Sequence, residues 1–224
     1  PDLLDWLARQ FIESGWSIKA MHRLIMSSQT YQRASVQDTG NAVIDSGNQY
    51  YWRFDRRRLD AEAIRDSMLL LGGNLNLEPP GPHPFPPADQ WRWTAHRQFQ
   101  AVYPTYHRSV YLMVQRLHPH PFLALFNGPD TSASTAMRDQ STVPLQALFM
   151  TNSELVDEQS HGLGRTLLEL DVDDRERIEW AYLRVFLRTP EVREVDRGVH
   201  FIYRYRTILS DEGVADAQRL QLAW

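Results

Sequence analysis

A run of prolines at residues 79–87 is the feature that most constrains what this chain can fold into. Six of the nine residues in PPGPHPFPP are prolines. Because proline has no amide donor and a fixed φ, the run excludes a helix or an inner strand and favours an extended polyproline conformation. We interpret it as a surface crossover, and the alternative is a ligand motif for a peptide-binding protein. Residues 74–107, which contain the run, are the least regular part of the chain.

Apolar residues before the prolines recur at helical spacing. They predict a helix from Leu3 to Phe11 that ends near Gly15, and a second helix that is capped by Ser17. Residues 32–50 are polar and weakly patterned, which is typical of a loop. A third helix is predicted from Asp60 to the glycines at 72 and 73.

The pattern after the prolines is also mainly helical. Pro121–Phe126 reads as one apolar turn of helix, and Pro144 opens a long amphipathic helix with a break near Gly162–Gly164. Asp171 or Asp173 then caps a further helix, and the last helix restarts at residues 189–191. The sequence therefore predicts a mainly α fold.

Residues 109–114 are the exception, because Val110, Leu112 and Val114 alternate there with Ser109, Tyr111 and Met113, in β-branched and aromatic company. We expect a few short β-strands around this stretch and long irregular connections rich in aromatic residues and proline. We expect one domain over residues 1–224, cut from a longer chain. A subdivision into a mixed helical and irregular part, 1–140, and a helical part, 141–224, is the alternative.

Composition narrows the function classes. The net charge of −4 argues against a general nucleic-acid binder. The chain has no cysteine, which excludes thiolate metal sites, disulfides, cysteine nucleophiles and covalent haem attachment within it. No apolar run approaches the length that spans a membrane.

The polar loop Asn127–Thr142 is the first candidate site. It offers Asn127, Asp130 and Arg138, and Asn152 follows in the next helix. Together with aromatic residues such as Trp91 and Trp93, these side chains would suit a hydroxyl-rich ligand such as a sugar. The alternative is a buried polar network that fixes the loop and caps the helix at Pro144.

Catalytic and metal sites are less strongly indicated. Asp130 with Asp139 could supply the paired carboxylates of a glycoside hydrolase, which must lie about 5–10 Å apart. His118 and His120 have a spacing that could bind a metal, but a third ligand such as His107 would be needed. We therefore assign no metal and no cofactor to the chain.

Several sequence blocks resemble one uncharacterised family. They are LLDWLARQFIESGWSIKAMHRLIMSSQTYQRAS, RRRLDAEAIRDSMLLLGG, RSVYL, LFNGPD and STVPLQALFMTNS, in this order. The family is the C-terminal domain of large planctomycete multidomain proteins, many of which carry a cytochrome c-like domain. Its Leu-Gly-Arg-x-Pro motif corresponds here to Phe186–Pro190, with Leu187 in place of glycine.

The resemblance implies an extracytoplasmic parent protein, with any haem in a separate domain, and it implies no reaction. We expect a non-catalytic binding or scaffold module whose partners are other domains of the parent and a polysaccharide. A hydrolase acting on carbohydrate or sulfated glycan is the first alternative. A docking domain for the haem-bearing domain of the same protein is the second.

Overall fold

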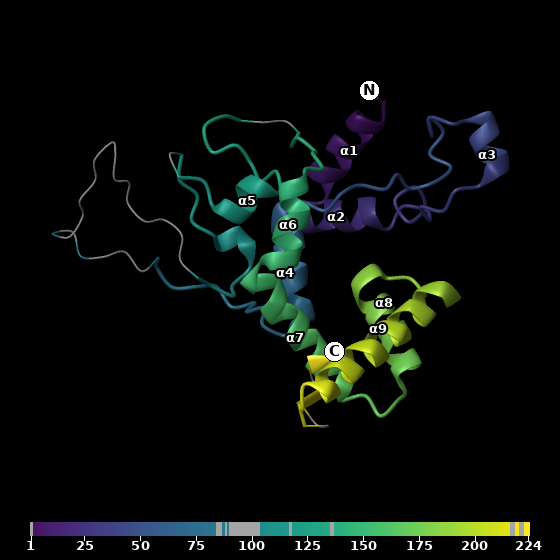
Figure 1. Cartoon of the computed structure of the whole chain (residues 1–224). Helices are drawn as coiled ribbons and strands as arrows, with labels where there is room; N and C mark the ends of the chain where they lie inside the picture. The colour runs from purple at the N-terminus through teal and green to yellow at the C-terminus, as the bar shows by residue number, and fades with distance from the viewer. Residues whose placement is uncertain are drawn as a thin grey trace. The chain divides into compact units, whose positions relative to one another are not determined.

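A computed structural model (Figure 1) describes residues 2–83, 87, 89, 104–116, 118–134, 137–215, 218–219 and 222–224. Within these residues the regular structure is mainly α-helix, as the sequence predicts. The chain divides into two compact units, Pro1–Arg58 and Leu59–Trp224. The boundary considered at residue 140 falls inside the second unit, because helices from both sides of it pack together there.

The first unit contains three helices. They are α1 (Asp2–Glu13), α2 (Ile18–Met26) and α3 (Thr39–Ile44). Ser17 caps α2 by accepting a hydrogen bond from the amide of Ala20 at 3.2 Å, and Gly15 adopts a φ of 70° between the first two helices. Helix α3 was not predicted, because only its Asp38 cap marks it in a polar sequence.

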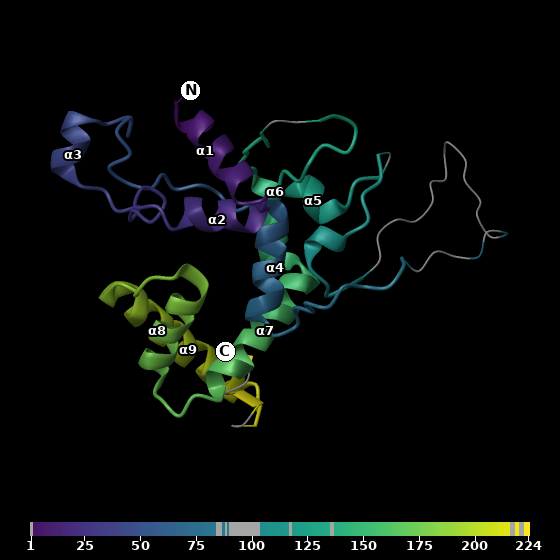
Figure 2. The ribbon, with the colours of Figure 1, turned by 180° about the vertical axis from the view of Figure 1, so that it is seen from behind.

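Helices α4 (Ala61–Leu71) and α7 (Glu154–Leu168) lie side by side in the second unit (Figures 1 and 2). A Cβ atom on Gly162 would lie 2.2 Å from the carbonyl oxygen of Gly72, so the crossing requires glycine. The predicted helix break at Gly162–Gly164 is therefore wrong. Those glycines permit close packing, and the break comes at Ser153 between α6 (Pro144–Asn152) and α7.

An apolar cluster lies between α4, α5 (Pro121–Leu125) and the chain before it. Its buried members are Ala61, Leu112, Phe122, Leu123 and Phe126. The rings of Phe122 and Phe126 stack with centroids 4.6 Å apart, and Phe149 of α6 meets both edge-on. This cluster fixes the irregular segment around Leu112 to the helices.

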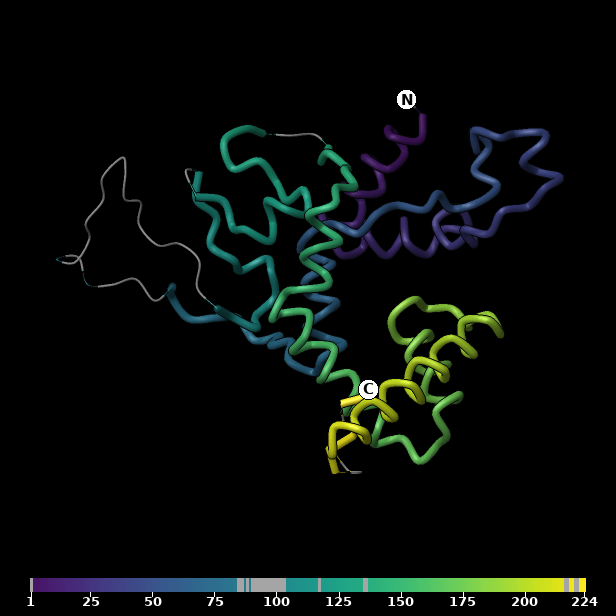
Figure 3. Tube along the Cα trace, in the orientation of Figure 1, coloured from purple at the N-terminus to yellow at the C-terminus, as the bar shows by residue number. Residues whose placement is uncertain are grey.

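Helices α8 (Asp174–Phe186) and α9 (Val192–Asp211) form a second pair (Figure 3). Their own apolar cluster contains Ile178, Val195, Ile202 and Ala223. The chain turns between them through Leu187, whose φ of 54° is in the left-handed region that glycine favours. This is the position at which the resembled family carries glycine.

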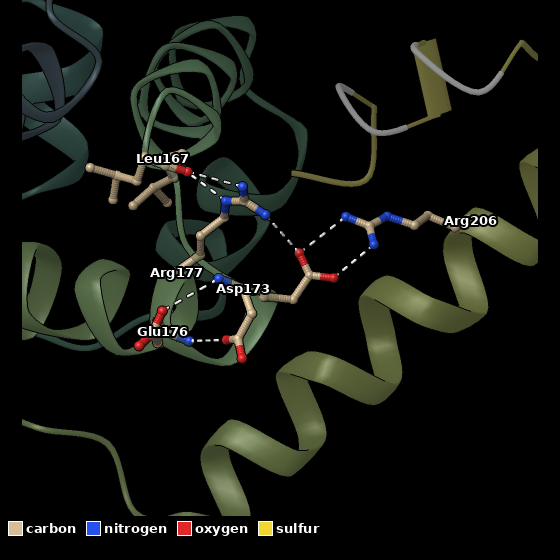
Figure 4. Close-up of polar contacts among 7 residues, drawn as sticks. Leu167, Asp173, Glu176, Arg177 and Arg206 are labelled. Carbon is tan, nitrogen blue, oxygen red and sulfur yellow. Dashed lines mark hydrogen bonds and ion pairs between the residues drawn. The ribbon is translucent and has the colours of Figure 1, made fainter.

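Polar contacts tie α8 to α7 and α9 (Figure 4). Of the two predicted caps, Asp171 and Asp173, it is Asp173 that caps α8, and it does so reciprocally with Glu176. Arg177 donates to the carbonyl oxygens of Leu167 and Leu170 at 3.2 and 3.0 Å, which satisfies the end of α7. The adjacent carboxylate of Asp174 accepts hydrogen bonds from both Arg177 and Arg206.

The strand predicted at residues 109–114 is wrong. Ser109–Tyr111 forms a short 3-10 helix, η2, and residues 112–114 continue without strand pairing. The amide of Ser109 donates to the Asp66 carboxylate, and that of Leu112 donates to the Ser109 carbonyl, so these donors are satisfied outside a sheet. The described residues contain one isolated parallel bridge, between Asn76 and His107.

None of the helices in the described part of the chain is both long and apolar enough to span a bilayer.

Candidate functional site

Arg65 of α4 organises the irregular segment 105–109. Its side chain is almost fully buried, and its guanidinium donates to the carbonyl oxygens of Thr105 and His107 and to Ser109 Oγ. The last two distances are 3.0 and 3.1 Å. Asp66, the next residue, accepts from the amide of Ser109 at 2.7 Å. We call Arg65 and Asp66 the buried clamp.

The electrostatics of the buried clamp follow from its position. Burial lowers the pKa of Arg65, and the nearby charge of Asp66 partly offsets this effect. A guanidinium nevertheless stays charged at any physiological pH. The clamp therefore places a permanent cation beneath the segment 105–109.

Further contacts hold the same segment from its other side. The amide of Asn76 donates to the Tyr106 carbonyl at 2.9 Å, and His107 Nδ1 bonds to the Glu78 carbonyl at 2.9 Å. The Tyr106 hydroxyl reaches the Glu158 carboxylate of α7 at 2.5 Å, and this bond raises the pKa of Tyr106. The backbone of residues 104–107 is thus a preorganised wall.

This wall borders a pocket of about 230 Å³. We call it the histidine pocket, since three of its lining residues are His83, His107 and His120. The other lining residues are Pro80, Gly81, Pro82, Pro104, Thr105, Tyr111, Leu112 and Met113. Hydrogen-bonding groups and apolar faces therefore line one small pocket.

The protonation of two of these histidines follows from their surroundings. A carbonyl oxygen only accepts, so the contact with Glu78 places the proton of His107 on Nδ1 and, in the neutral ring, leaves Nε2 as an acceptor. Burial and the charge of Arg65 lower the pKa of His120. His120 is therefore neutral at pH 7, and its Nδ1 is buried without a hydrogen-bond partner in the described structure.

The sequence-predicted polar loop is held to α4 by a different arginine. Arg138 donates to both carboxylate oxygens of Glu62, one of them at 3.0 Å, and lies 4.0 Å from Asp60. Burial would raise the pKa of Glu62, but the hydrogen bonds and charge of Arg138 outweigh it and lower that pKa. We call Arg138 and Glu62 the surface clamp, because both side chains are partly exposed.

The remaining loop candidates have local partners or face solvent. Asn127 has a φ of 58°, and its side-chain oxygen accepts from the amide and hydroxyl of Ser141. Asp130 is exposed and accepts from the amide of Ser132 at 2.8 Å, and Asp139 is also exposed. The loop therefore makes local hydrogen bonds, while Asp130 and Asp139 are exposed to solvent rather than buried in a network.

The other candidates lie apart from this loop or outside the described residues. Asn152 ends α6 in an exposed position, and it lines a separate shallow depression with residues of α7. Trp91 and Trp93 are not among the described residues. The sequence reasoning missed Arg65 and Tyr111, for which helix periodicity and composition give no distinctive signal.

The two metal candidates are not equivalent. His120 lines the histidine pocket, whereas His118 is exposed and does not line it. Within the part of the chain that the structure describes, no three His, Cys, Asp or Glu residues gather closely enough to hold a metal ion.

Comparison with known protein families gives a match over most of the chain. The family PSD1, whose description is "Protein of unknown function (DUF1553)", matches residues 1–202. No curated protein matches the chain. No solved structure matches it either.

Proposed function

This chain belongs to the PSD1 (DUF1553) family. We propose that it is a non-catalytic binding module. Its histidine pocket binds a hydroxyl-rich ligand, such as a sugar unit of a polysaccharide. The observation that carries the proposal is the pocket itself, with its imidazole, phenol and proline lining. The resemblance to planctomycete multidomain proteins supports an extracytoplasmic parent protein as its setting.

The chemistry of the lining favours hydroxyl groups over ions. A sugar hydroxyl can donate to an imidazole nitrogen and accept from the Tyr111 hydroxyl, and neither contact requires a charged partner. Prolines and Met113 offer apolar surface to the C–H faces of a sugar ring. The volume of about 230 Å³ lies below the usual range for sites that enclose drug-sized ligands, so it suits one small polar unit.

Rigidity also supports a binding role. The buried clamp and the Glu78 contact fix the backbone of one wall before any ligand arrives. A preorganised wall lowers the conformational cost of association.

The test is a glycan array followed by calorimetric titration of the sugars that bind. We expect His120→Gln and Tyr111→Phe to weaken binding about tenfold each, the loss of roughly one hydrogen bond. His118→Gln is the matched control, because this exposed histidine does not line the pocket.

Three outcomes would overturn the proposal. Binding that depends on Asp130 and Arg138 but not on His120 would move the ligand to the polar loop. Glycan turnover that Asp130→Asn or Asp139→Asn abolishes would favour the hydrolase alternative. Binding of a haem-bearing domain, with no glycan binding by the folded chain, would favour the docking alternative.

A further inference from the structure

Two histidines of the pocket can each bond a ligand through only one ring nitrogen. His107 donates from Nδ1 to the Glu78 carbonyl, so its Nε2 remains for a ligand, and in the neutral ring this nitrogen is an acceptor. In His120, Nδ1 is buried and no described group bonds to it, so a ligand in the pocket can reach only Nε2. The Nε2 atoms of both rings are therefore the ring contacts open to a ligand.

The surroundings of His120 place the proton of its neutral ring on Nε2. A buried N–H group without an acceptor is rarer in proteins than an acceptor without a full set of donors, which favours a bare lone pair at the buried Nδ1. The buried positive charge of Arg65 acts on the same ring, and a cation attracts a lone pair and repels an N–H group. The two histidines are therefore opposite tautomers, since His107 accepts through Nε2 and His120 donates through Nε2.

Apolar surface makes up much of the remaining lining. It comes from Pro80, Pro82, Pro104, Leu112 and Met113. None of the described lining residues carries a carboxylate, a guanidinium or an ammonium group. The pocket thus combines a ring acceptor, a ring donor and apolar surface, and it offers no acidic partner to a cation.

An acetamido group has the complementary combination. It carries one N–H donor, one carbonyl acceptor and one methyl group in a single plane, and its trans amide bond points the donor and the acceptor in opposite directions. The N–H suits Nε2 of His107, and the carbonyl oxygen suits Nε2 of His120. The methyl group can be buried against the prolines, Leu112 and Met113, whereas a hydroxyl at the same position has no methyl to bury.

We propose that the ligand of the histidine pocket is an N-acetylated amino sugar that binds through its acetamido group. This inference rests on the proposed function, because it names the class of sugar that the same pocket takes. The hydroxyls of Tyr111 and Thr105 also line the pocket and are partners for the hydroxyls of the sugar ring. An acetylated lysine shares the acetamido group but has no hydroxyls for these partners. A deacetylated amino sugar fits less well, because its ammonium group brings a second cation toward Arg65.

Calorimetric titration of the chain with three β-1,4-linked disaccharides tests the proposal. They are N,N′-diacetylchitobiose, its deacetylated form and cellobiose, which differ only in the acetamido, ammonium or hydroxyl group at carbon 2. We expect diacetylchitobiose to bind about tenfold more tightly than cellobiose, which is the value of one further hydrogen bond and a buried methyl group. The deacetylated form should bind more weakly than either.

The variant His120→Phe removes the ring donor and retains a planar ring. It should weaken the binding of diacetylchitobiose about tenfold and that of cellobiose much less, so that the preference for the acetamido group is lost. His118→Phe is the matched control, since this exposed histidine does not line the pocket, and it should keep the preference.

Nuclear magnetic resonance of the unchanged chain, with 15N-labelled histidine, measures the tautomers without any variant. At about pH 8, where imidazoles are ordinarily neutral, we expect the proton of His107 on Nδ1 and that of His120 on Nε2. A proton on Nδ1 of His120 would remove the donor from the pocket and would overturn the inference.

The titrations separate this inference from the proposed function. Cellobiose that binds as tightly as diacetylchitobiose, with His120 required for both, would overturn the inference and leave a sugar-binding pocket. The same holds if other glycans bind in the pocket and none of the three disaccharides does. Failure of every glycan would overturn both proposals. An acetylated lysine peptide that binds more tightly than diacetylchitobiose would place a protein ligand in the pocket and would also overturn both.

Discussion

The buried clamp and the surface clamp perform the same task in different surroundings. Each joins an irregular segment to the first two turns of α4 through an arginine. Arg65 is buried, and its guanidinium donates hydrogen bonds to two carbonyl oxygens and a hydroxyl. Arg138 is about one-third exposed, and its guanidinium donates hydrogen bonds to the carboxylate of Glu62.

This difference in burial determines which of the two clamps contributes more to the free energy of unfolding. A carbonyl buried without its donor loses a hydrogen bond that water cannot replace, whereas a partly exposed carboxylate regains water when its partner leaves. The buried clamp should therefore control global stability and the surface clamp only the local order of the loop.

Replacing Arg65 should have the largest effect. Arg65→Met keeps most of the side-chain volume but leaves two carbonyl oxygens and Ser109 Oγ without their donor. We expect a loss of about 3–5 kcal/mol in the free energy of unfolding, measured by urea titration. Arg65→Lys should recover only part of this loss, because an ammonium cannot span the same acceptors. A loss below about 1 kcal/mol for Arg65→Met would contradict the comparison.

Removal of the carboxylate of Asp66 should cost less. Asp66→Ala leaves one buried amide, that of Ser109, without an acceptor, and we expect a loss of about 1–3 kcal/mol. Asp66→Asn retains an acceptor oxygen and is the matched control. Equal losses in the two variants would show that the charge, rather than the hydrogen bond, is what stabilises the segment.

Breaking the surface clamp should have a small effect on global stability. Because the pair is partly exposed, Arg138→Gln should lower the free energy of unfolding by no more than about 1 kcal/mol. Hydrogen exchange should nevertheless accelerate at residues 137–142 and not in α4. Faster exchange throughout α4 would mean that the two clamps are energetically equivalent.

The two clamps should also respond differently to pH. The pKa of Glu62 is lower in the folded chain than its ordinary 4.5, so its contribution is present above pH 4.5 and is lost as the pH falls through the folded value. Carbonyl and hydroxyl acceptors do not titrate. The stability difference between the chain and Arg138→Gln should thus disappear in acid, while the difference for Arg65→Met should largely persist. Thermal melts of the unchanged chain and of both variants, recorded in parallel between pH 7 and pH 3, measure these two stability differences.

The sequence predicted most of the helices but not the histidine pocket. Caps and breakers act locally, so Ser17, Asp173 and Pro144 marked helix starts that the structure confirms. The strand predicted at residues 109–114 failed because Arg65 and Asp66, more than 40 positions away, bind Ser109 at the start of a 3-10 helix. Val110 and Val114 are exposed rather than buried on one face of a sheet. The histidine pocket joins residues from 80 to 120 through such distant contacts, which no local pattern encodes.

The crossing of α4 and α7 limits how the lengths of these helices can vary. One residue inserted into α7 before Gly162 would turn the rest of that helix by about 100° and bring a side chain against the Gly72 carbonyl. Seven inserted residues, close to two full turns, would nearly restore the facing of the helix but shift it by about 10 Å. Insertions and deletions are therefore expected in the connections between the helices, and the number of residues from Glu154 to Gly162 is expected to be invariant.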